Sequence, residues 1–158
     1  MEIIEVVDTA VKIGLGALIT GIATHMLASR NFKNDLRKKN VENNLILIKE
    51  LSIKLEHAEA LLNEGTHSYY LEETGADFSA TPIIDAAKLV YESRAMANLL
   101  GEVSLTKGIG ELAKIFDEIY NEFCEVNNHG TVSELIKKVE DKKAELYPLI
   151  TLAYDKFA

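Results

Sequence analysis

The chain has little of what usually cross-links a protein or breaks its helices. Cys124 is the only cysteine among 158 residues, which excludes an intramolecular disulfide and leaves any zinc site dependent on other ligand types. Two prolines and no tryptophan occur, so long stretches can form uninterrupted helix. No sustained alternation of apolar and polar residues is present, and we therefore expect no strands. These absences favour an all-α chain.

Motifs for catalysis and metal binding are also scarce. The segment Gly108–Gly110 lacks the third glycine and the preceding strand of a dinucleotide-binding loop. Glu64 and His67 have the Glu-x-x-His spacing of di-iron bundles, but no second such pair occurs. No nucleophile–histidine arrangement stands out either. We therefore predict a protein that is not an enzyme and holds no cofactor or metal, with a small metal-binding helical bundle as an alternative.

Basic residues are fewer than acidic ones, 17 against 25, and they are unevenly distributed. A short segment, residues 30–40, holds five of them beside a single acid, Asp35. The five are Arg30, Lys33, Arg37, Lys38 and Lys39. Nucleic-acid binding needs a broad basic surface, so an acidic chain with one basic segment predicts no nucleic-acid partner. We expect these five residues to contact anionic lipid headgroups.

The longest apolar stretch lies just before this basic segment. From Ile13 to Ser29 no Asp, Glu, Lys or Arg occurs, and extension back to Ala10 gives the roughly 20 residues that span a bilayer, with Lys12 near one end. Acidic residues precede the stretch, the reverse of a secretory signal. Residues 1–29 are therefore predicted to form a single membrane-spanning helix, with the N-terminus outside and residues 30–158 in the cytoplasm. The alternative is a helix buried between protomers of a soluble or virion-like assembly.

Small residues recur along one face of this first helix. They are Ala10, Gly14, Ala17, Gly21, Thr24 and Ala28, separated alternately by four and three residues. Because a face of small side chains lets two helix backbones approach closely, we predict a helix–helix interface here. The partner is either a second copy of the chain or a larger membrane protein.

The remainder, residues 41–158, has the pattern of an acidic helical bundle. Apolar residues recur at three and four over residues 31–64, and the polar residues 37–40 and 43–44 interrupt that pattern at a predicted hinge. Residues 65–80 are expected to form a loop, in which Tyr69 and Tyr70 are candidate contacts for a protein partner, with at least one of them covering the core.

Three further helices are predicted after this loop. One begins with Thr81 as its N-cap and Pro82 in its first turn, and presents Ile84, Tyr91 and Leu99 to the core. The second covers residues 105–126, with its apolar stripe starting at Ile109. The last has a capping box formed by residues 131 and 134, and a kink or break at residue 148, a proline.

Short connections between four amphipathic helices favour an antiparallel bundle after the first helix. The function predicted is that of an accessory, adaptor or regulatory subunit, joined to a membrane complex by its first helix and to a cytoplasmic protein by its bundle.

Overall fold

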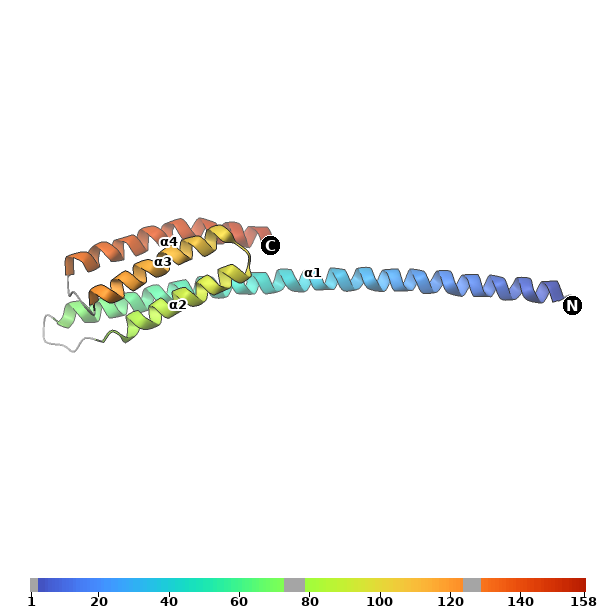
Figure 1. Ribbon diagram of the computed structural model, residues 1–158, viewed down its shortest axis with the longest axis horizontal. Coiled ribbons are helices and arrows are strands. Elements are labelled where there is room, and N and C mark those ends of the chain that lie inside the picture. The colour runs from blue at the N-terminus through green and yellow to red at the C-terminus, as the bar shows by residue number, and fades with distance from the viewer. Residues whose placement is uncertain (1–2, 73–78, 124–128) are drawn as a thin grey trace. The chain divides into compact units, whose positions relative to one another are not determined.

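The computed structural model describes the backbone of residues 3–72, 79–123 and 129–158, and the side chains of residues 18–70, 79–123 and 130–158. Within these ranges it has four α-helices and no strand (Figure 1), so the predicted all-α class is confirmed. They are α1 (Ile3–Glu72), α2 (Thr81–Leu99), α3 (Val103–Asn121) and α4 (His129–Phe157). The chain divides into two units, residues 1–42 and residues 43–158, and α1 belongs to both.

Helix α1 runs through the positions where the sequence predicted a hinge. Residues 37–44 are helical, and the two helices expected over residues 1–29 and 31–64 form one element of 70 residues. Lysine and arginine are good helix formers when their heads stay in water, and no proline or glycine lies between Gly21 and Gly65. The polar run therefore changes the surface of α1 without interrupting its backbone.

Residues 43–158 form an antiparallel four-helix bundle in which each helix contacts two neighbours. Side chains link α1 to α2 (Lys54–Glu92, 2.7 Å), α2 to α3 (Tyr91–Asp117, 2.6 Å), α3 to α4 (Glu111–Lys142, 2.9 Å) and α4 back to α1 (Lys143–Glu59). Residue numbers rise along one helix as they fall along its neighbour, since Lys54 pairs with Glu92 whereas Gly65 lies against Ile83. This up-down-up-down order matches the predicted bundle.

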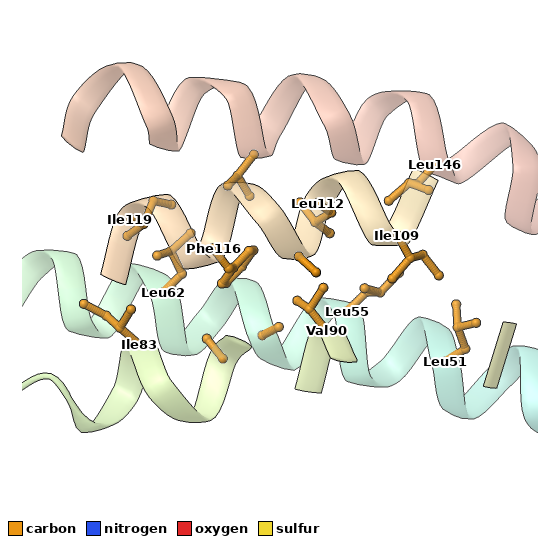
Figure 2. Packing of buried hydrophobic residues seen from close by; sticks show 14 of the residues in the cluster. Leu51, Leu55, Leu62, Ile83, Val90, Ile109, Leu112, Phe116, Ile119 and Leu146 are labelled. Carbon is orange, nitrogen blue, oxygen red and sulfur yellow. The ribbon is translucent and has the colours of Figure 1, made fainter. Parts of the chain in front are cut away.

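The core lies along the axis of this bundle, where all four helices contribute apolar side chains (Figure 2). On α1 the predicted stripe is buried from Ile48 onward, and on α3 it is buried from Ile109. Phe116 of α3 is fully buried at the centre of this cluster. These two stripes were predicted correctly because each apolar face has charged or polar residues on its other sides.

The predicted core face of α2 is wrong. Ile84, Tyr91 and Leu99 are exposed by 48%, 44% and 75%. The buried positions lie one or two residues away, at Ile83, Ala86, Val90, Ser93 and Ala97. Small side chains on this face allow α2 to pack closely, and the Ser93 hydroxyl donates to the Leu89 carbonyl at 2.8 Å, which satisfies it inside the core.

The expected loop at residues 65–80 also needs correction, because α1 continues to Glu72. Gly65 is therefore not a turn residue but lies where α1 contacts α2. A Cβ at this position would lie 2.6 Å from Cγ1 of Ile83, so only glycine lets the two helices approach this closely. Thr66 is buried in the helix and donates to the Leu62 carbonyl at 2.6 Å. Of the predicted loop, residues 73–78 lie outside the described ranges.

Helix ends differ from the prediction as well. Thr81 is the first residue of α2 and its amide donates to Ser79 Oγ at 3.4 Å, so Thr81 is not the N-cap. Thr131 lies inside α4, which starts at His129, and therefore does not form the predicted capping box. Pro148 does not break α4, which continues to Phe157. Its ring is exposed, and Leu146, two residues before it, is buried in the core.

Candidate association surfaces

The described part of unit 1 consists of one helix, and its apolar side chains are uncovered. Leu18, Ile19, Ile22, Met26 and Leu27 have exposed fractions between 51% and 64%. A soluble helix normally buries such residues against a neighbouring element. The apolar side chains of residues 18–27 thus form an exposed surface of the kind that a soluble helix normally covers.

Within unit 1 the predicted small-residue face is exposed to solvent at each position whose side chain the structure describes. Gly21, Thr24 and Ala28 are exposed, and a Cβ at Gly21 would meet no atom within 4 Å. The Thr24 hydroxyl donates to the Thr20 carbonyl at 2.8 Å, so it presents its methyl group without an unsatisfied donor. The other three predicted interface residues have side chains outside the described ranges. They are Ala10, Gly14 and Ala17.

All five basic residues predicted to contact lipid are exposed, and none forms an ion pair with another described residue. Arg30, Lys33 and Arg37 line a shallow recess together with Asn34. Their spacing of three and four places them on one side of α1, whereas Lys38 and Lys39 lie on other sides. The recess therefore concentrates three cations that remain available to an anionic surface.

No helix in the portion of the chain covered by the structure combines the length and the apolar character needed to cross a membrane. The single-pass helix expected over residues 1–29 remains a prediction.

The tyrosine pair predicted to lie in a partner loop is divided between core and surface. Both residues belong to α1, where Tyr69 is 1% exposed and Tyr70 is 38% exposed. The Tyr69 ring meets the Phe123 ring edge to face, with centroids 4.2 Å apart. The prediction that one tyrosine covers the core is confirmed, and Tyr70 alone remains as a candidate contact.

Glu64 and His67, the residues of the metal-binding alternative, are exposed near the end of α1. Across the described residues no three His, Cys, Asp or Glu side chains come together as a group that could hold a metal ion.

A surface that sequence reasoning missed is an apolar groove between α1 and α4, inside the 43–158 unit. Its volume is about 570 Å³. The lining residues are Leu45, Ile46, Ile48, Lys49, Ser52 and Ile53 from α1, and Ile150, Thr151 and Tyr154 from α4. Ile46 and Ile53 are more than half exposed at its edge. Because the two helices meet only in the folded bundle, no local sequence signal marks this groove.

Elsewhere along the contact between α1 and α4, a cluster of polar side chains bridges the two helices. Lys143, whose side chain is only 11% exposed, pairs with Glu59 and lies 3.7 Å from Glu56, and Tyr147 donates to Glu56. Burial of the Lys143 ammonium acts to lower its pKa, but the hydrogen bonds to Glu59 and Tyr147 and the nearby carboxylates outweigh burial and raise the pKa above its ordinary value. The hydrogen bond to Glu56, followed by burial, raises the pKa of Tyr147.

These raised pKa values predict a loss of stability at alkaline pH. Lys143 and Tyr147 hold their protons more tightly when folded, so their contribution is complete below their unfolded pKa values of about 10 and is lost as the pH rises through the folded values. We expect the unfolding free energy to fall progressively above about pH 10. Urea denaturation at a series of pH values measures this, and Tyr147→Phe is expected to flatten the decline. An unfolding free energy that stays constant with pH would contradict the prediction.

Comparison of the chain with protein-family models, with curated proteins and with solved structures finds no match.

Proposed function

We propose that this chain is a membrane-anchored, non-enzymatic accessory or regulatory subunit that works by helix–helix association. The observation that carries the proposal is the exposed apolar surface of residues 18–27, followed directly by the unpaired basic segment of residues 30–40. Apolar side chains suit the hydrocarbon core, and a cationic segment beside them suits the anionic headgroups of the cytoplasmic leaflet. In this arrangement the N-terminus is outside and the bundle is cytoplasmic.

The composition of the first helix favours a helix partner over lipid alone. Each large aliphatic residue favours insertion by about 0.3–0.6 kcal/mol, which is a small gain against the cost of Lys12 and His25. Close packing of the small-residue face on another helix would add van der Waals contacts. The partner is thus a second copy of this helix or a helix of a larger membrane protein, and the acidic bundle is free to bind a cytoplasmic protein.

Cell fractionation with a reporter at the C-terminus tests the anchor. Because the bundle is expected to weaken at alkaline pH, membranes are washed in parallel with carbonate and with concentrated salt at neutral pH. Retention in the pellet after both washes, with the reporter inside the cell, supports the proposal. Release by both washes would reject it, and a large particle on gel filtration would then favour the soluble or virion-like assembly.

A pair of leucine substitutions tests the small-residue face. Gly21→Leu is expected to raise the dissociation constant of the complex in detergent about tenfold or more. The larger side chain would separate two helix backbones that pack closely. Ala23→Leu is the control, since it adds a leucine on the opposite side of the same helix turn. Chemical cross-linking and sedimentation measure the assembly. Unchanged assembly in Gly21→Leu would remove the interface from the proposal.

A further inference from the structure

The α1–α4 groove is a local opening in a seam that is otherwise packed. Around Leu55 and Leu146 the remaining space between the two helices is only about 10 Å³. About two turns further, beside Ile48 and Tyr154, it widens to about 570 Å³. The side chains of Lys143 and Tyr147 reach across to α1 at the narrow part, whereas the smaller Thr151 lines the wider part.

The walls of this groove are aliphatic. Leu45, Ile48, Ile53 and Ile150 supply apolar surface from both helices. A groove of this volume lies within the range of small-molecule sites, which are mostly apolar and carry a few polar groups that orient the ligand. Its extent along α1, from Leu45 to Ile53, is about 12 Å at the helical rise of ~1.5 Å per residue. The shape therefore suits a single flexible hydrocarbon chain.

The polar groups of the groove separate into bonded and available ones. Ser52 donates to the Ile48 carbonyl at 2.9 Å and Thr151 to the Tyr147 carbonyl at 3.0 Å, so both hydroxyl protons are already used. The Lys49 ammonium and the Tyr154 hydroxyl make no side-chain hydrogen bond or ion pair with another described residue. Lys49 is also the single charged residue in the lining, and no carboxylate accompanies it.

From this combination we infer that the groove binds a single-chain anionic amphiphile, of which a long-chain fatty acid is the simplest example. The hydrocarbon chain lies between α1 and α4, and the carboxylate is held by the Lys49 ammonium and the Tyr154 hydroxyl. An aliphatic groove with one unpaired cation is complementary to such a ligand in both polarity and charge. The inference concerns the bundle alone and does not depend on the proposed membrane anchor.

Photolabelling of the full chain in phospholipid vesicles tests the site. The probe is palmitate with a diazirine in its chain, and labelled peptides are located by mass spectrometry. We expect adducts on residues 45–53 and 150–154 that unlabelled palmitate displaces. Lys49→Glu is expected to reduce them about tenfold, because charge-assisted hydrogen bonds are lost and a repulsive carboxylate is added. Lys137→Glu, at an exposed lysine of α4 outside the groove, is the matched control.

The outcomes separate this site from the anchor. Adducts on residues 13–29 report lipid contact of the first helix, so their absence beside a labelled groove would reject the anchor and leave the amphiphile site standing. An unlabelled groove beside a labelled first helix would overturn the site. Equal labelling by the palmitate methyl ester with no effect of Lys49→Glu would also overturn it. Intermolecular cross-links that cover residues 45–53 would instead assign the groove to a second copy of the chain.

Discussion

Replacing Phe116 with alanine is expected to lower the unfolding free energy of the 43–158 bundle by about 3–5 kcal/mol. Phe116 lies on α3, is fully buried, and belongs to the cluster to which all four helices contribute. Truncation removes most of an aromatic side chain from the middle of this cluster and leaves a cavity that the surrounding helices fill only in part. A loss of this size is a large share of the stability of an ordinary domain of this length, so partial unfolding at moderate temperature is also expected.

Phe32→Ala is the matched control, because the same side chain is removed where it is 65% exposed and lies in the other unit. Urea denaturation followed by circular dichroism gives both free energies, with the fluorescence of Tyr69 and the other tyrosines as a second probe. We expect Phe32→Ala to leave the bundle transition within about 0.5 kcal/mol of the parent chain. If both variants shifted the transition equally, Phe116 would not occupy the core.

Periodicity predicts α3 well and α2 poorly for a physical reason. In α3 the apolar positions from Ile109 to Ile119 form one stripe, and acids occupy the remaining faces. In α2 two apolar stripes lie side by side, one through Ile84 and one through Ile83, and local sequence does not determine which of them meets the other helices. Tertiary packing selects the face with the smaller side chains, since this face brings α2 closer to α1 and α3.

Some candidate surfaces are formed by a single helix and can be predicted from sequence spacing, whereas the groove is formed by two helices that are distant in sequence. The small-residue face and the basic residues of α1 are properties of one helix, so spacing alone is enough to place them on its surface. The groove beside Lys49 depends on contact between residues about a hundred positions apart, and on where Lys143 and Tyr147 close the seam. Its chemistry therefore becomes visible only after the bundle is assembled.

Gly65 is a residue type that is typical of loops, but in the folded chain it permits close packing of two helices. It lies within α1, and its missing side chain makes room for Ile83 of α2, which is fully buried. Gly65→Val is expected to destabilise the bundle by about 2–3 kcal/mol, because the new Cβ would lie 2.6 Å from Cγ1 of Ile83, a fully buried residue. Urea denaturation of the full chain measures the loss.

The Ile83→Ala background separates this clash from the intrinsic effect of valine in a helix. Ile83→Ala alone should cost about 2–5 kcal/mol, but it removes the two atoms nearest to the new side chain, Cγ1 and Cδ1. In that background Gly65→Val is expected to cost less than about 0.5 kcal/mol or to stabilise, since valine then fills part of the cavity and has a better helix propensity than glycine. An equal penalty at Gly65 in both backgrounds would mean that contact with Ile83 is not what requires glycine there.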